Sequence, residues 1–189
     1  AQGQPGTFLT SLGIGFLRAL YRAMGESATC FGYVAVDKAE VLGVVVGTED
    51  SAGLFRSLLG RSGIKLALPV VGAVLQRPSL LRSVIETVFY TQRAARGSKG
   101  AEILFIGTRE SRRGEGVGRA LFQAFVQSCR ARGLASIGLS VDDANESAKR
   151  FYRRNGMRFA HDFRLYGRQM HWCAKPLGTG HESDGQERA

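Results

Sequence analysis

The chain has 189 residues, enough for one domain with a substantial core, and its 44% hydrophobic and 22% charged residues exclude a largely disordered protein. Because 26 Lys and Arg outweigh 16 Asp and Glu, the net charge is +10 and the expected partners are anionic: nucleic acid, phosphorylated small molecules, acidic proteins or a lipid surface. Three cysteines without CxxC or metal-ligand spacing predict reduced thiols, no metal and a cytoplasmic protein. No apolar run approaches the ~20 residues of a membrane helix, and no signal peptide is expected.

The N-terminal part of the chain predicts a helix followed by a hairpin. Apolar residues at spacings of three and four predict an amphipathic helix over residues 8–24. Two runs rich in β-forming residues, 29–36 and 40–48, are separated by Asp37-Lys38-Ala39, which predicts a β-hairpin.

Residues 51–99 have a different composition. Their helical spacing, interrupted by Gly and Pro, predicts two or three short helices. The segment holds eight basic residues and only one acidic residue, so it carries +7 of the net charge. Its charge predicts either contact with an anionic partner such as a lipid surface, or only a helical cover of the sheet with its arginines in solvent.

The C-terminal half alternates strands and helices. The patterns predict strand 102–108, a glycine-rich turn, helix 117–132, strand 136–141 and helix 145–154, and then a hairpin of strands 157–166 and 168–175 with Gly167 at its turn. Residues 1–175 are therefore expected to form a single domain, and the polar residues 176–189 a disordered tail.

The turn from Arg112 to Arg119 lies directly between a predicted strand and a predicted helix. Its glycines allow a tight backbone turn whose N–H groups point into one concavity, and the positive end of the helix adds to that field. No Gly-Lys-Ser/Thr follows, which excludes a Walker loop, and the spacing does not fit a dinucleotide fingerprint. The turn is therefore a candidate phosphate site, although a plain structural turn is the alternative.

This turn and a second motif resemble one known family. The spacing Arg113-x-x-Gly116-x-Gly118 resembles the acyl-CoA signature of the GNAT superfamily of N-acyltransferases. The pattern Asn145-x-x-Ala148-x-x-Phe151-Tyr152-x-x-x-Gly156 is similar to a later helix of that family. Its distance along the chain from the glycine-rich turn also matches the family. The resemblance is close over residues 102–160 and loose over residues 8–48 and 160–175.

The resemblance implies an α/β (α+β) fold: a single domain with a mixed, mostly antiparallel sheet flanked by helices. The chain departs from the family pattern in two ways. Residues 51–99 are expected to form a helical insertion between the third and fourth strands, near the region where acceptors bind in the family, so they would shape an acceptor pocket or dock a carrier protein. The family's first strand is missing before residue 8. Two explanations account for the missing strand: the chain is shortened, or a second copy in a homodimer completes the edge of the sheet.

The family signature implies which residues bind the acyl-CoA co-substrate. Backbone N–H groups of the turn are expected to hold the pyrophosphate, the preceding strand is expected to pair with the pantetheine arm, and Asn145 is expected to lie near its sulfur end. The residues concerned are Ile106, Gly107, Thr108, Arg113, Gly114, Glu115, Gly116, Val117, Gly118, Arg119 and Asn145.

Two further residues carry the chemistry that the resemblance implies. Tyr152 matches the tyrosine that usually protonates the departing thiolate, and its alternative role is packing. Glu102 lies where family members often carry a catalytic glutamate, on the same strand face as Ile106 and Thr108 if the strand alternates regularly; its alternative role is that of an exposed carboxylate.

The resemblance implies an acyl-CoA-dependent N-acetyltransferase that acts on a primary amine of a small molecule or amino sugar by direct attack. The alternative is a non-catalytic module that senses acyl-CoA or binds nucleic acid or an acyl carrier protein through its basic residues. Few aromatic residues are interleaved with the basic residues of 51–99, which makes nucleic acid the weaker expectation.

Overall fold

The computed structural model describes residues 13–51, 53–54 and 100–178. The insertion predicted at 51–99 and the last eleven residues fall almost wholly outside this part of the chain. In chain order the elements are α2 (Gly13–Gly25), β1 (Cys30–Asp37), β2 (Glu40–Thr48), β3 (Gly100–Thr108), the 3-10 turn η1 (Glu110–Arg112), α6 (Val117–Ala131), β4 (Ser136–Asp142), α7 (Glu146–Arg154), β5 (Arg158–Leu165) and β6 (Arg168–Pro176).

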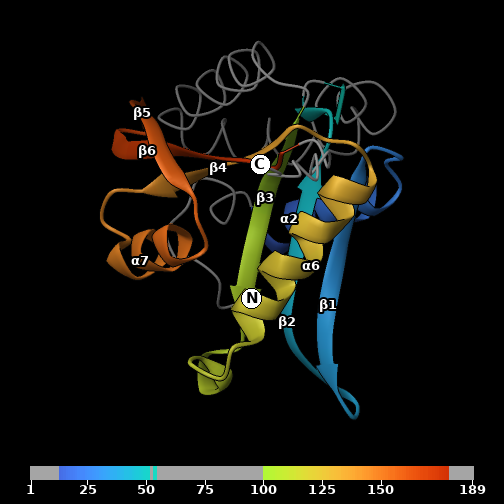
Figure 1. The fold of residues 1–189 in the computed structure, drawn as a ribbon. Helices are drawn as coiled ribbons and strands as arrows, with labels where there is room; N and C mark the ends of the chain where they lie inside the picture. Colours follow the sequence, from blue (N-terminus) through green and yellow to red (C-terminus); the bar gives the residue numbers. More distant parts are fainter. Residues whose placement is uncertain (1–12, 52, 55–99, 179–189) are drawn as a thin grey trace, which may run out of the picture.

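The described strands form one six-stranded sheet in the order β1-β2-β3-β4-β6-β5. Only β3 and β4 pair in parallel, and every other neighbouring pair is antiparallel. Helix α6 crosses in front of β1, β2 and β3, α2 lies behind these strands, and α7 stands beside β4 (Figure 1). The predicted fold class, a mixed and mostly antiparallel sheet flanked by helices, is confirmed.

The main hydrophobic core lies between α6 and the sheet. Helix α6 forms because its apolar residues recur at helical spacing, so Leu121, Phe122, Phe125 and Cys129 are all buried on one face. Phe125 is fully buried and stacks on Phe31 of β1, with 4.7 Å between ring centroids. This packing fixes α6, and with it the turn before α6, against the sheet.

The predicted hairpins are present, with tight turns at their tips. Lys38 has a φ of 55° between β1 and β2, while Tyr166 and Gly167 have φ values of 54° and 74° between β5 and β6. Two consecutive residues with positive φ are typical of a turn that matches the right-handed twist of its flanking strands.

The predicted start of the tail at residue 176 is wrong. Pro176 still belongs to β6, where it pairs with Ser136, and Leu177 is buried in the core with its N–H donating to the Ala135 carbonyl at 2.9 Å. A buried apolar side chain and a satisfied backbone donor keep this segment in the domain. Residues 179–189 lie outside the described residues.

Strand β3 contains an irregularity that the sequence pattern did not predict. Val46 of β2 pairs with Phe105, but Gly47 pairs with Ile103, so Leu104 is an extra residue in β3. Beyond this bulge the alternation of side chains is reversed.

The expectation that Glu102 shares a face with Ile106 and Thr108 is therefore wrong. Ile106 pairs with the core residue Val45 and packs against the core on the α6 side of the sheet. Glu102 precedes the bulge and pairs with Thr48, which puts its side chain on the opposite face.

Candidate active site

A gap between β3 and β4 is the central feature of the site. The two strands pair only at their beginnings, where Gly100 lies opposite Ser136 and Glu102 lies opposite Gly138. Beyond this point each strand continues without pairing to the other, and Figure 1 shows them diverging. Backbone groups inside a sheet need hydrogen-bond partners, so the gap can accept an extended chain that supplies them.

The backbone of β3 is oriented for such pairing. The Arg109 N–H donates to the Leu42 carbonyl of β2 at 2.7 Å. Because backbone groups along a strand alternate sides, those of Gly107 also point toward β2, whereas those of Ile106 and Thr108 point into the gap. Two of the three strand residues expected to bind the pantetheine arm thus present backbone groups there, and Gly107 does not.

The glycine-rich turn follows at the open end of the gap. Gly114 and Gly116 have φ values of 89° and 84°, in the left-handed region that glycine adopts without strain. The first backbone bond of α6 runs from the Ala120 N–H to the Gly116 carbonyl, 3.0 Å, so the N–H groups of residues 117–119 have no acceptor within the helix. The turn and the first turn of α6 thus form a cluster of donors at the positive end of a helix.

Helix α6 brings this turn against the end of β3 and against α7. A Cβ added at Gly118 would lie 3.5 Å from both Thr108 Cγ2 and Phe151 Cε2. Since these are ordinary contact distances, Gly118 allows a close approach of three elements without being sterically obligatory.

The charged side chains of the turn pair mainly within it. Arg113 is exposed and lies 3.4 Å from Glu110, while Arg112 pairs with Glu115 at 3.3 Å and with Asp37 at 3.5 Å. The side chain of Glu115 is therefore engaged with an arginine, which leaves its backbone N–H for an anion.

Asn145 has a structural role in the described chain. It is the N-cap of α7, and its Oδ1 accepts a hydrogen bond from the Ala148 N–H at 3.0 Å. This bond satisfies one of the free donors at the helix start and fixes the direction of α7. Its backbone N–H donates to the Asp142 carbonyl and its carbonyl accepts from the Lys149 N–H, so any contact of Asn145 with a co-substrate is left to its amide nitrogen.

Tyr152 lies on the buried face of α7, within the main core. Its ring makes an edge contact with Phe151, and burial raises the pKa of its hydroxyl to about 12, with the neighbouring Cys173 adding to the shift. The phenol therefore stays protonated throughout the neutral range. Tyr152 reaches the sheet from the α7 side.

Glu102 lies on the other face, at the closed end of the gap. Its Oε2 accepts a hydrogen bond from the Ser51 hydroxyl, a contact between the end of β2 and β3. The two candidate catalytic residues thus lie on opposite faces of the sheet. Glu102 is six residues from Thr108, roughly 20 Å along the strand, so it is far from the glycine-rich turn.

All three cysteines are unsuited to nucleophilic catalysis. Burial raises the pKa of Cys30, and it raises the pKa of Cys129 to about 12 and that of Cys173 to about 11. These thiols remain protonated at neutral pH, and the nucleophilic form of cysteine is the thiolate.

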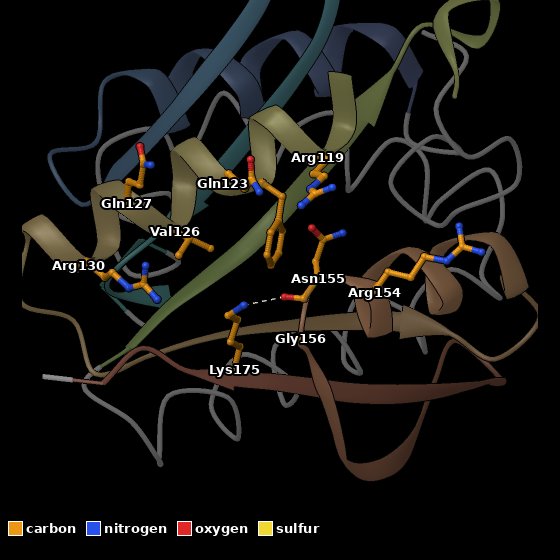
Figure 2. A pocket seen from close by; sticks show the side chains of 10 residues that line it. Arg119, Gln123, Val126, Gln127, Arg130, Arg154, Asn155, Gly156 and Lys175 are labelled. Carbon is orange, nitrogen blue, oxygen red and sulfur yellow. Dashed lines mark hydrogen bonds between the residues drawn. The ribbon is translucent and has the colours of Figure 1, made fainter. Parts of the chain in front are cut away.

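A cationic pocket opens between α6, the end of α7 and β6 (Figure 2). Its volume is about 560 Å³, and no acidic residue is among the described residues that line it. Lys175 Nζ donates to the Asn155 carbonyl at 2.7 Å, the contact drawn in Figure 2. The positive charge comes from four side chains, Arg119, Arg130, Arg154 and Lys175.

Three of these four cations were missed by sequence reasoning. Arg130, Arg154 and Lys175 belong to three different elements, and no local spacing relates them. Only Arg154 falls inside a motif that the sequence singled out, one residue before the Asn155-Gly156 turn.

Within residues 13–51, 53–54 and 100–178, no group of three or more His, Cys, Asp or Glu side chains is arranged to hold a metal ion. Over the same residues, no helix has the length and apolar character needed to cross a membrane.

Parts of the chain are similar in sequence to known acetyltransferases. Mycothiol acetyltransferase of Thermobispora bispora is 41% identical over 64 residues, which are 33% of this chain and 22% of that protein. Mycothiol acetyltransferase of Streptosporangium roseum is 40% identical over 55 residues, 29% of this chain and 16% of that protein. The matched segments thus span about a fifth of the length of these relatives.

Solved structures share the fold at low sequence identity. The ribosomal-protein-S18-alanine N-acetyltransferase from Escherichia coli has a TM-score of 0.55 at 14% identity and covers 86% of this chain and 79% of its own. An aminoglycoside 6′-N-acetyltransferase complexed with coenzyme A has a TM-score of 0.53 at 15% identity, covering 82% and 77%.

The family itself is established by a match over most of the sequence. The sequence pattern of the Acetyltransferase (GNAT) family matches residues 11–157, a range that contains the glycine-rich turn, the strand gap and the helix of Tyr152. The chain belongs to the GNAT family of acetyltransferases.

Proposed function

We propose that this protein transfers an acetyl or related acyl group from acyl-CoA to the primary amine of a small molecule. The observation that carries the proposal is the gap between β3 and β4. The candidate base Glu102 lies at its closed end on one face of the sheet, and the candidate acid Tyr152 packs in the core on the other face. A thioester held in such a gap is reachable from both faces: an amine can attack from one, and an acid can act on the leaving group from the other.

The donor would lie along β3 and the start of α6. Its pantetheine arm would take hydrogen bonds from the backbone of Ile106 and Thr108, in the manner of an added strand. The pyrophosphate would bind the N–H groups of residues 114–119, with Arg113 and Arg119 adding charge-assisted bonds. The cationic pocket, which begins at Arg119, fits the phosphorylated nucleotide end of the same molecule.

The chemistry needs one base and one acid. Glu102 would accept the proton that the amine loses, and the amine nitrogen would form a bond to the thioester carbonyl carbon. When the carbon–sulfur bond breaks, the Tyr152 hydroxyl would donate its proton to the departing thiolate. No covalent enzyme intermediate is required, which agrees with three protonated, buried or half-buried thiols.

The acceptor is proposed to be a small-molecule amine or an amino sugar. The partial matches to two mycothiol acetyltransferases and the fold shared with an aminoglycoside 6′-N-acetyltransferase support an acceptor of this size class. A cytoplasmic location, where acyl-CoA is available and thiols stay reduced, fits the three free cysteines.

Calorimetric titration with acetyl-CoA, followed by a CoA-thiol release assay across a panel of primary amines, tests the proposal. We expect binding well below 1 mM and turnover with at least one amine. Because burial holds the protein thiols protonated, the released CoA thiol will dominate the signal. Binding without turnover would favour an acyl-CoA sensor, and no binding would overturn the transferase.

A further inference from the structure

An aromatic pair lies on the face of the sheet that carries Glu102. His161 of β5 pairs with Trp172 of β6, and both alternate with residues that face α7. Cys173 is buried in the core on the α7 side, so the adjacent Trp172 points to the opposite face. A bulge between Phe159 and His161 brings His161 opposite Trp172 and therefore onto that same face. That is the face onto which the bulge in β3 directs Glu102.

Trp172 leans toward Glu102 across β4. A Cβ added at Gly138 would lie 2.2 Å from Trp172 Cζ2, so only glycine at this position leaves room for the indole ring. Gly138 is also the β4 residue that pairs with Glu102, and paired strands are about 4.8 Å apart. The indole therefore covers the backbone directly beside the candidate base.

His161 extends this surface outward. Its ring is stacked on Trp172, with 6.3 Å between centroids and 19° between the ring planes. His161 is exposed and Trp172 is partly exposed, so the stacked pair offers aromatic surface to solvent on the face that carries Glu102.

From this arrangement we propose that Trp172 and His161 form the acceptor platform, and that the preferred acceptor carries its primary amine on a saturated ring, as a 2-amino sugar does. The inference rests on the proposed transferase function and narrows its substrate class. A saturated ring can lay its C–H face on the two stacked rings while its amine reaches Glu102.

The preference for an amine on a saturated ring follows from the aromatic surface of Trp172 and His161. A short acyclic amine can reach Glu102 but covers neither ring, so it gains only the electrostatic part of the binding. A ring-borne amine gains the aromatic contact as well, and that gain should appear in acceptor KM and in kcat/KM.

The test uses the full chain with acetyl-CoA, glucosamine as the ring amine and ethanolamine as the acyclic control. Trp172 is the single tryptophan of the chain, so glucosamine should change the intrinsic fluorescence while ethanolamine at the same concentration should not. His161→Ala should lower kcat/KM for glucosamine about tenfold and leave the value for ethanolamine unchanged. Trp172→Phe, which keeps an aromatic face, should retain most of the preference for glucosamine.

A matched control is His171→Gln, because His171 lies on the same strand as Trp172 but points to the other face; it should leave the preference unchanged. Equal losses for both amines in His161→Ala, or a glucosamine titration without a fluorescence change, would overturn the platform. A fluorescence response without thiol release from any amine would keep the platform and overturn the transferase.

Discussion

The side chain of Tyr152 is buried, and its hydroxyl is the proposed acid of the reaction. Water is largely excluded from its ring, so ionisation is disfavoured and the pKa rises to about 12. A phenol with this pKa keeps its proton throughout the neutral range, so it is in the form that can donate to the sulfur as the carbon–sulfur bond breaks. The same burial that packs α7 onto the sheet thus holds the proposed acid in its protonated form.

Replacing Tyr152 with Phe removes the proton donor while keeping the ring that packs in the core. We expect kcat to fall about 10²- to 10⁴-fold, the usual contribution of a positioned general acid, with little change in the KM for acetyl-CoA. Steady-state kinetics at pH 7.5 measures both constants.

The matched control is Tyr33→Phe on the edge strand β1, where the side chain is 40% exposed. This variant should keep wild-type kcat. Full activity in Tyr152→Phe would remove Tyr152 from the mechanism and leave it a packing residue.

At the scale of elements, helix α6 is bounded by two glycines with positive φ, one just before its first residue and one just after its end. Gly116 begins the helix with a φ of 84° and Gly133 follows its end with a φ of 69°. A Cβ at either position would meet no atom within 4 Å, so Ala substitution at both has the same cost, which is backbone strain alone.

Gly116→Ala and Gly133→Ala should each lower the free energy of unfolding by about 1 kcal/mol, because both force an L-residue into the left-handed region. Only Gly116→Ala should raise the Kd for acetyl-CoA, since it redirects the N–H groups of the turn. Chemical denaturation and calorimetric titration provide the two readouts. An equal effect of both variants on Kd would show that the turn does not bind the donor.

Helix α7 is tied to the β5–β6 hairpin by a charged network. His171 of β6 contacts Asp162 of β5 through Nδ1 at 2.6 Å and Asp143 of the β4–α7 turn through Nε2 at 2.8 Å. Lys149 of α7 contacts the same Asp143 oxygen at 2.8 Å, and also Glu146 at 2.6 Å. Lys149 is one helical turn before Tyr152, so the network holds the segment that carries the proposed acid.

The pKa values of this network predict how its strength depends on pH. The two carboxylates raise the pKa of His171, and the bonds from Lys149 and His171 lower the pKa of Asp143 to about 2. A raised histidine pKa stabilises the fold below the ordinary value near 6.5, and this contribution is lost as pH rises through the folded value. A lowered aspartate pKa stabilises the fold above pH ~4 and is lost as pH falls toward 2.

The difference in Tm between wild type and His171→Gln should therefore be largest, a few degrees, between pH ~4 and ~6.5. It should shrink as pH rises through neutrality and as pH falls toward 2. Thermal melts followed by circular dichroism across this range measure it, with His161→Gln on the opposite face as the control. A difference that is constant with pH would show that His171 stabilises only through packing.

At the scale of the whole molecule, Phe125 joins the helix layer to strands β1 and β2. It is fully buried, it stacks on Phe31, and a Cβ added at Gly47 would lie 2.3 Å from its Cζ. The glycine in β2 thus makes space for the ring.

Phe125→Ala should lower the free energy of unfolding by about 3–5 kcal/mol, because it removes a large buried ring and leaves a cavity. Gln127→Ala, an exposed change on the same helix, should alter it by less than about 0.5 kcal/mol. Urea denaturation of both variants tests this, and a small loss in Phe125→Ala would mean that the core collapses around the missing ring.

The sequence determined the helices, the strands and the motifs that resemble the family, because each depends on the spacing of residue types over a short stretch of chain. Apolar periodicity predicted α6 and α7 to within one residue at each end, and the hairpin turns follow from short polar or glycine-containing connections. The positive φ values of Gly114 and Gly116 were likewise implied by glycine at those positions of a strand-to-helix turn.

Only the tertiary structure decided which of these residues meet. The bulge at Leu104 moved Glu102 to the face opposite Ile106, and a one-residue irregularity in pairing leaves no pattern in the strand's own sequence. The cations of the pocket come from three separate elements, and the Trp172 ring lies over Gly138, the β4 residue that pairs with Glu102, only because of strand order and register. Spacing along the chain encodes local structure, whereas strand register and packing place distant side chains together, and these depend on the whole fold.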